Sequence, residues 1–279
     1  MATNIIVARG GVEYVPPISL AFWRWFFVFL ILLPFLYSEI YKKRKFLKKE
    51  FYKLFFLGLM GCGVCGAFPF IAGMSTTMAN MGIIYTSSPV FIVILSVFLF
   101  SEKISLNRIV GLIICLIGVI TIITKGNFNY LINFSFTTGD FWMLCAAIGW
   151  ALYSIYLLNW KSKFSLMGRF TLIAFFGFIS LFPFYILEES LFFDTKFNST
   201  FLAWVLFAAI SPGIIAFSLY TKVQRYLGAS LTGFTLYLFA VYGAIFGIIL
   251  FEEMLLPFHY YGGALVFAGV YIARKIKTI

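Results

Sequence analysis

Two stretches of this sequence, 151 residues apart, carry the same pattern of long apolar segments joined by a short turn that contains glutamate. The first stretch covers 88–124 and the second 239–275, with Glu102 and Glu253 in the turns. The identical positions at this spacing include, in the first stretch, Val90, Leu99, Phe100, Glu102, Gly111, Gly118 and Val119. An internal repeat of membrane-length segments is typical of a helix bundle built from two duplicated halves.

The composition places this bundle in a membrane. Hydrophobic residues make up 62% of the chain and charged residues 11%, which is more apolar surface than one water-soluble core could bury. The net charge of +11 does not indicate nucleic-acid binding, because the cations lie between the apolar segments, where they favour a cytoplasmic loop beside anionic lipid. The partner expected from composition is therefore the lipid bilayer and not nucleic acid.

About 20 apolar residues cross the ~30 Å hydrocarbon core of a bilayer as a helix. Nine stretches are long enough, and they are 18–37, 54–73, 81–100, 107–124, 139–159, 168–187, 200–220, 229–251 and 258–273. A shorter stretch, 2–12, supplies a tenth helix. At an offset of 149 residues Met1 aligns with Trp150, inside the sixth helix. This alignment predicts a first helix truncated by roughly ten residues, too short to span the core.

The distribution of cations predicts the orientation. Of the 21 Lys and Arg residues, 17 fall in alternate loops on one side, and the positive-inside rule places that side in the cytoplasm. With ten helices both termini are then cytoplasmic, in the plasma membrane or bacterial inner membrane. Each half, 1–125 and 139–275, has five helices, and an odd number makes the halves insert with opposite topology. The expected fold class is an all-α membrane protein with ten transmembrane helices in two inverted five-helix repeats.

Short motifs recur in order along both halves. They are Pro16-Pro17 with Leu20-Ala21-Phe22-Trp23-Arg24, Ser88-Pro89-Val90-Phe91, Glu102 with Gly111 and Gly118-Val119, Gly149-Trp150-Ala151-Leu152-Tyr153, Gly228-Ala229-Ser230, and Gly262-Gly263-Ala264-Leu265 with Ala268-Gly269-Val270-Tyr271. Together they resemble the EamA domain family of the drug/metabolite transporter superfamily. The resemblance implies a central cavity lined mainly by helices 1, 3, 4, 6, 8 and 9, and transport by alternating access. Ala240 and Phe251 depart from the family, which usually has Pro and Gly there.

Polar residues share one face of the expected fourth helix. At 100° per residue, Tyr85, Ser88 and Pro89 fall close together on that face. Pro89 removes a backbone donor and kinks the helix, which frees a carbonyl near Tyr85 for substrate or water. The alternative is a seam that packs against neighbouring helices through hydrogen bonds.

Other polar and aromatic residues are candidates for the cavity wall. Helix six presents Trp150, Tyr153 and Ser154 within about one turn. Stripes of small and polar residues on helices eight and nine contain Ser218 and Tyr237. For these stripes, contact between helices is the alternative to lining the cavity.

Three polar residues near the amino end extend this set. Asn4 takes the place of Tyr153 in the first repeat, and a membrane asparagine is costly unless it is satisfied. Its alternative role is a hydrogen bond that joins two helices. Arg9 and Arg24 lie toward the outer ends of helices one and two, where they either attract anionic substrate groups or extend to the lipid headgroups.

The sequence lacks the parts of an enzyme. It has a single histidine, His259, and no nucleophile-elbow or Walker motif, so no catalytic residue, cofactor or metal site is expected. Without an ATP site, transport requires a gradient. The expected function is secondary transport of a small polar or amphipathic metabolite, with export or exchange implied by the resemblance; the alternative is a non-transporting membrane scaffold or partner subunit. Gly243 and Gly247 form a GxxxG pair that suits either packing within the bundle or a homodimer.

Overall fold

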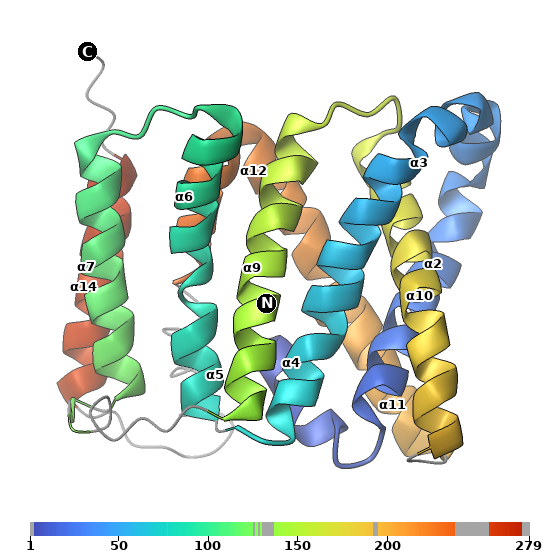
Figure 1. Ribbon diagram of the computed structural model, residues 1–279, viewed down its shortest axis with the longest axis horizontal. Helices are drawn as coiled ribbons and strands as arrows, with labels where there is room; N and C mark the ends of the chain where they lie inside the picture. The colour runs from blue at the N-terminus through green and yellow to red at the C-terminus, as the bar shows by residue number, and fades with distance from the viewer. Residues whose placement is uncertain are drawn as a thin grey trace.

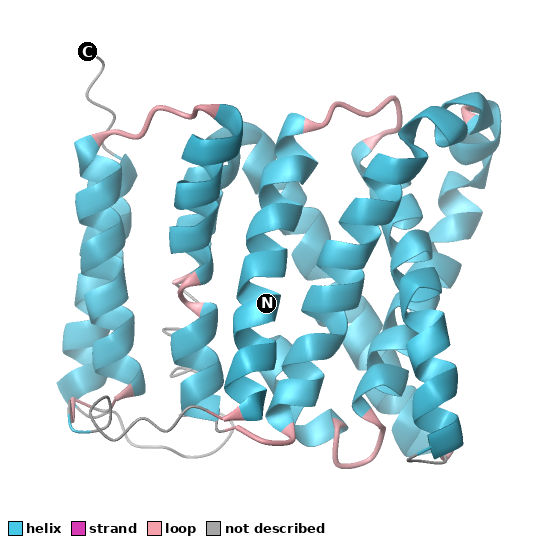
Figure 2. Ribbon diagram, in the orientation of Figure 1, coloured by secondary structure: helices cyan, strands magenta, loops and turns pink. Residues whose placement is uncertain are grey.

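The computed structural model describes residues 3–76, 78–124, 126–127, 129, 137–191, 195–237 and 257–274. Within these ranges every regular element is a helix (Figure 2). Most of the expected ninth span lies outside the described residues, and so do Gly243, Gly247, Glu253 and the side chain of Arg9.

The first half of the chain forms α1 (Thr3–Ile6), η1 (Val7–Gly11), α2 (Pro17–Lys42), α3 (Arg44–Gly58), η2 (Leu59–Val64), α4 (Cys65–Gly73), α5 (Met78–Tyr85), α6 (Ser88–Phe100) and α7 (Leu106–Ile123). The second half forms α9 (Thr138–Asn159), α10 (Leu166–Leu191), α11 (Ser199–Ala208), η3 (Ala209–Ile215), α12 (Ala216–Gly233), η4 (Phe234–Leu236) and α14 (Pro257–Arg274). In the described part of the chain, five continuous helical stretches are long and apolar enough to cross a membrane: Pro17–Lys42, Arg44–Gly73, Thr138–Asn159, Leu166–Leu191 and Ser199–Leu236. The chain is therefore a multi-pass helical membrane protein.

The helices stand side by side, with their connections at two opposite ends (Figure 1). The α2–α3 junction and the turns 101–105 and 160–165 lie at one end, which carries Lys43, Lys103 and Lys163 and is called the basic end. The turns 12–16 and 74–76 lie at the other end. The sequence predicted that most Lys and Arg residues lie in the loops at one end of the bundle.

Side chains fix the starts of two helices at the end opposite the basic end. Thr137 and Asp140 form a capping box, in which the Asp140 amide donates to Thr137 Oγ1 and the Thr137 amide donates to the Asp140 carboxylate. Asn198 Oδ1 accepts from the Phe201 amide at 2.8 Å and starts α11. These caps satisfy amide groups that a helix leaves open at its first turn.

The expected fourth helix is broken at 86–87 into α5 and α6. Pro89 lies in the first turn of α6 and has no amide hydrogen to donate to Tyr85. The Ser88 hydroxyl donates to the Tyr85 carbonyl at 2.6 Å instead. The sequence predicted a kink at Pro89, and the structure has a break just before it. The Tyr85 carbonyl, which was expected to be free for substrate, accepts from Ser88.

Three helical segments, η1, η2 and η3, have the wider π-helical turn. Each adjoins an α-helix: η2 joins α3 to α4, and η3 joins α11 to α12. In η3, Pro212 lacks an amide hydrogen, which disfavours the regular α-helical ladder. A π-helical turn holds an extra residue, so it rotates the face that the following helix presents.

Helices α7 and α14 pack as an antiparallel pair, at the left of Figure 1. Gly111 lies against Gly269, where a Cβ atom on Gly111 would come within 2.5 Å of the Gly269 carbonyl oxygen. Gly118 lies against Gly262 in the same way, at 2.7 Å. Between them, Cys115 Sγ contacts the Val266 carbonyl oxygen at 3.4 Å. The repeat spacing relates Gly111 to Gly262 and Gly118 to Gly269. In the structure, Gly111 contacts the repeat counterpart of Gly118, and Gly118 contacts the repeat counterpart of Gly111.

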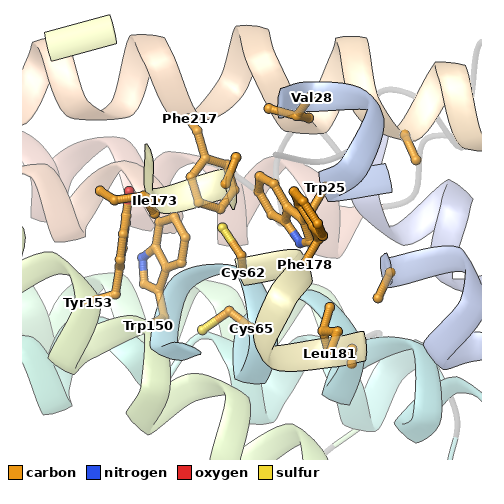
Figure 3. Close-up of a cluster of buried hydrophobic side chains, with 14 of the residues drawn as sticks. Trp25, Val28, Cys62, Cys65, Trp150, Tyr153, Ile173, Phe178, Leu181 and Phe217 are labelled. Atoms are coloured by element: carbon orange, nitrogen blue, oxygen red, sulfur yellow. The ribbon is translucent and has the colours of Figure 1, made fainter. Parts of the chain in front are cut away.

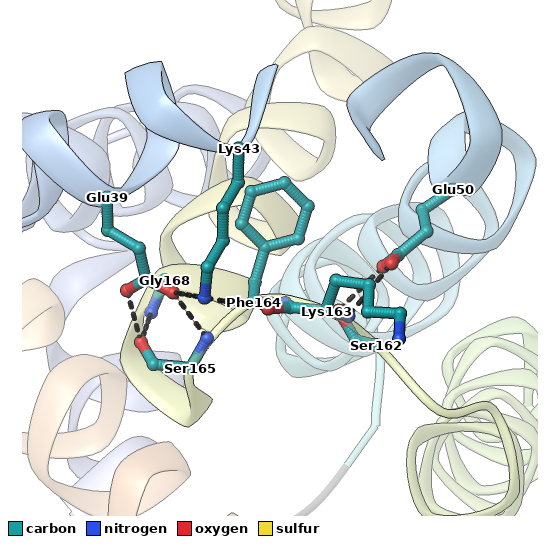
Figure 4. Close-up of polar contacts among 8 residues, drawn as sticks. All are labelled: Glu39, Lys43, Glu50, Ser162, Lys163, Phe164, Ser165 and Gly168. Carbon is teal, nitrogen blue, oxygen red and sulfur yellow. Dashed lines mark hydrogen bonds and ion pairs between the residues drawn. The ribbon is translucent and has the colours of Figure 1, made fainter. Parts of the chain in front are cut away.

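Helices α2 and α10 form a second long pair, and a glutamate closes each end of it. At the basic end, Glu39 of α2 accepts from the Ser165 amide at 2.6 Å and the Ser165 hydroxyl at 2.5 Å (Figure 4). At the opposite end, Glu188 of α10 accepts from the amides of Ile18 at 3.0 Å and Ser19 at 2.7 Å. Each helix therefore ends in a carboxylate that holds the start of the other helix.

Replacing Glu188 by leucine is expected to lower the free energy of unfolding by about 2 kcal/mol, because the Ile18 and Ser19 amides lose their acceptor. Glu188→Gln keeps one amide oxygen and should lose about half as much. Thermal unfolding in detergent measures both changes. Glu13→Leu, in an exposed turn at the same end, is the control. Equal melting temperatures for Glu188→Leu and Glu13→Leu would contradict the capping role.

Candidate functional site

A cluster of aromatic side chains from three helices fills the centre of the described bundle (Figure 3). Trp150 of α9 lies 5.4 Å from Tyr153 and 5.2 Å from Phe217 of α12, between ring centroids. Trp25 of α2 contacts Phe217 from the other side at 4.9 Å. Tyr220 of α12 completes the cluster, 4.9 Å from Trp150. Two of these rings, Trp150 and Tyr153, were expected from the sequence to lie at the site.

Two glycines make room for the large rings. A Cβ atom on Gly61, in η2, would lie 2.5 Å from the Tyr153 ring. A Cβ atom on Gly66, in α4, would lie 2.5 Å from Trp25 Nε1. The helix formed by η2 and α4 therefore passes directly over both aromatic side chains, and the glycines of this helix are what allow the approach.

Arg24 is buried beside this cluster. It is 2% exposed, and its Nη1 donates to Asn4 Oδ1 at 2.7 Å. Its guanidinium carbon lies 4.6 Å from the centroid of the Trp25 ring. Among the described residues neither Arg24 Nε nor Trp25 Nε1 has a hydrogen-bond partner. The guanidinium is therefore enclosed by protein within the described bundle.

Residues of α1, α5 and η3 surround Arg24. The Asn4 side chain reaches it from α1, and Tyr85, the last residue of α5, lies within electrostatic range of it. Ser211 of η3 is tied to α1 by a hydrogen bond from its hydroxyl to Thr3 Oγ1 at 3.1 Å. The structure therefore brings together Asn4, Arg24 and Tyr85 from distant parts of the sequence. Ser88 and Pro89 lie close by, at the α5–α6 break.

Ser154 is part of a buried polar contact between α9 and α12. Its hydroxyl lies 2.9 Å from the Tyr220 hydroxyl, and its carbonyl accepts from Gln224 Nε2 at 2.7 Å. Ser218 does not face this contact, because its hydroxyl donates to Met167 Sδ of α10 at 3.5 Å. The face of α12 that meets Ser154 carries Tyr220 and Gln224 instead. The π-helical turn of η3 lies directly before α12 and rotates the face that α12 presents, which accounts for the position of Ser218.

Tyr237 lies apart from the other candidates. It is fully buried in a separate cluster with Phe234 and residues of α7 and α14, including Cys115 and Val266. Gly228, with φ +80° and ψ 171°, breaks α12 before this point. Only glycine adopts that conformation readily, so the chain turns there away from the Trp150 cluster.

The sequence alone missed Trp25, Phe217 and Tyr220. All three are apolar or weakly polar residues within apolar spans. Phe217 and Tyr220 also follow the π-helical segment η3, across which helical position cannot be read. The glycines opposite the large rings, Gly61 and Gly66, are the sequence signal that could have indicated close packing of this helix.

Comparison with known proteins identifies the family. The model of the EamA-like transporter family matches residues 1–124 and 137–274. The chain belongs to the EamA-like transporter family. The resemblance drawn from the sequence motifs is thus confirmed.

Two relatives of this EamA-like chain are named as uncharacterized transporters. One, from Methanothermobacter thermautotrophicus, is 26% identical over 81% of this chain, and the match spans 65% of the relative, slightly less than two thirds of its length. The other, YetK of Bacillus subtilis, is 24% identical over 98% of this chain and 82% of the relative. A chain of known crystal structure has the same fold, with a TM-score of 0.74 and 17% identity over 98% of this chain and 93% of that one.

Proposed function

We propose that the protein is a secondary transporter of a small polar or amphipathic metabolite, an exporter or exchanger that works by alternating access. The buried Arg24 carries this proposal. An ionisable residue inside a membrane is costly and usually marks a substrate or ion pathway. Arg24 is held by the neutral Asn4 and by the Trp25 ring, and its Nε is available. A polar substrate group that binds at Arg24 would meet aromatic rings around it.

The proposed architecture is ten helices in two inverted repeats, and the α7–α14 pair supports it. These two helices are counterparts in the internal repeat, and they run antiparallel. Their glycines contact each other reciprocally, Gly111 with Gly269 and Gly118 with Gly262. A two-fold axis in the membrane plane, passing between Cys115 and Val266, produces this pattern of contacts. Glu39 of α2 and Glu188 of α10 show the same reciprocity, since each accepts from an amide at the start of the other helix.

An exchange experiment tests the transport function. The purified protein is reconstituted into vesicles loaded with a mixture of isotopically labelled metabolites, and the loss of each label against external unlabelled mixture is followed by mass spectrometry. We expect one chemical group of metabolites to exchange through the wild-type protein and not through empty vesicles. If no metabolite exchanges although the protein is folded and inserted, the scaffold alternative is favoured.

The orientation can be tested by cysteine labelling. We expect Lys45 and the basic end to face the cytoplasm and the segment around Lys196 to face outward. In a chain whose four native cysteines are replaced by alanine, a membrane-impermeant maleimide added to intact cells should label Lys196→Cys and not Lys45→Cys. Lys196 is preferred to Asn198 as a probe because Asn198 caps α11. The reverse labelling would overturn the orientation.

A further inference from the structure

A pocket of about 310 Å³ opens at the basic end between α9, α10 and α12. Its outer wall carries Lys161 and Arg225, which are exposed, and Arg169 lies deeper. Tyr153 and Phe170 line its apolar part. The pocket is separate from Arg24, but it meets the central aromatic cluster through the Tyr153 ring.

Arg169 is the deepest cation of the pocket. It is 7% exposed, and its Nη1 donates to the Leu157 carbonyl at 2.7 Å. Its Nε has no hydrogen-bond partner among the described residues. A guanidinium with one side anchored to a backbone carbonyl and another side unpartnered is suited to bind an anionic oxygen.

The carboxylate that acts electrostatically on Arg169 is already engaged elsewhere. Glu50 of α3 accepts from the Ser162 hydroxyl at 2.6 Å and from the Lys163 amide at 2.9 Å (Figure 4). It therefore holds the 160–165 turn in place at the edge of the pocket. Glu50 does not line the pocket, whose charged lining residues are all cations.

We propose that this pocket binds the anionic group of a small amphipathic substrate, a carboxylate or a phosphate, on the cytoplasmic face of the transporter. The anionic group contacts Arg169, Arg225 and Lys161, and the apolar part of the molecule lies against Phe170 and Tyr153. The same chemistry would also receive the headgroup of an anionic lipid. This inference rests on the proposed transport function and assigns its substrate class.

Equilibrium binding tests the inference without transport. The protein is placed in nanodiscs of phosphatidylcholine and titrated calorimetrically with benzoate and with phenyl phosphate. Benzyl alcohol and benzylamine serve as neutral and cationic probes of similar shape. We expect the anions to bind at least about tenfold more tightly than the other two, because charge-assisted hydrogen bonds distinguish them. Equal affinities for all four probes would overturn the inference.

Variants assign the binding to this pocket. Arg225→Gln and Lys161→Gln change exposed side chains, and each is expected to weaken benzoate binding about tenfold. Lys222→Gln is the matched control, since Lys222 is also exposed on α12 but does not line the pocket. Arg169→Gln should have a larger effect, provided that its melting temperature is retained. Equal affinities for Arg225→Gln and Lys222→Gln would place the anions elsewhere and contradict the proposal.

Two further arms separate the sources of the anion. Phosphatidylglycerol in the nanodisc should leave benzoate affinity unchanged if the ligand is a soluble metabolite. If phosphatidylglycerol weakens benzoate binding to the wild-type protein but not to Arg225→Gln, the lipid headgroup occupies the pocket. That result would overturn the proposed substrate class. The metabolite exchange experiment is independent of this result: exchange of neutral or cationic compounds alone would refute the inference and leave the transport function standing.

Discussion

Replacing Arg24 by leucine is expected to abolish metabolite exchange while leaving the melting temperature unchanged or higher. The loss of two charge-assisted hydrogen bonds to substrate corresponds to at least about a 100-fold lower exchange rate. Stability should not fall, because leucine removes a buried cation that no carboxylate neutralises among the described ion pairs. Vesicle exchange and thermal unfolding on the same preparation measure the two quantities.

Arg24→Lys and Arg44→Leu complete this experiment. Lysine keeps the charge without the planar fork of donors, so an intermediate rate, about tenfold below wild type, is expected. Arg44 is exposed at the basic end, and its removal should leave exchange intact. A normal exchange rate in Arg24→Leu would refute the role of this residue in transport. A large fall in melting temperature would instead indicate that Arg24 is structural.

Replacing Gly262 by leucine is expected to separate α7 from α14 and to prevent recovery of a monodisperse protein. A Cβ atom at this position would lie 2.7 Å from the Gly118 carbonyl oxygen and 2.5 Å from Ile122 Cγ1. A backbone oxygen cannot rotate away, so the helices must move apart, at a cost of about 3 kcal/mol or more. Size-exclusion chromatography and thermal unfolding in detergent measure the outcome.

The adjacent residue provides the control for this prediction. Gly263 is in the same helix, and a Cβ atom there would have no described atom within 4 Å. Gly263→Leu should therefore yield folded protein with a melting temperature close to wild type. Gly111→Leu, whose Cβ would face the Gly269 carbonyl oxygen at 2.5 Å, should behave like Gly262→Leu. Similar behaviour of the Gly262 and Gly263 variants would contradict the close packing of this pair.

Hydropathy and charge predicted much of this fold because both act through the membrane itself. Long apolar segments have one stable arrangement in lipid, and the cations of the loops lie at one end. A local distortion next to Pro89 was also predictable, since it depends on one missing backbone donor; the sequence predicted a kink, and the structure has a break at 86–87. The positions of α7 and α14 beside each other were not, because the repeat gives correspondence between residues but not contact between them.

The candidate site was harder to predict because it depends on rotation about helix axes. Three π-helical segments adjoin the site, and no composition signal distinguishes them from α-helix. The resulting shift of one residue on α12 replaces Ser218 by Phe217, Tyr220 and Gln224 at the centre. Tyr237 was a candidate for the same cavity wall as Tyr153, but it is buried in a separate cluster with Phe234, Cys115 and Val266.

The two glutamates that close the α2–α10 pair constrain how the molecule moves. Glu39 holds the start of α10 at one end through two hydrogen bonds from Ser165. Glu188 holds the start of α2 at the other end through three hydrogen bonds from Ile18 and Ser19. A pair fastened at both ends cannot spread at either end without breaking one of these sets. The α2–α10 pair therefore forms a rigid frame, whose two helices move together as one body. Under the proposed alternating access, opening toward either side of the membrane requires other helices to move relative to this frame.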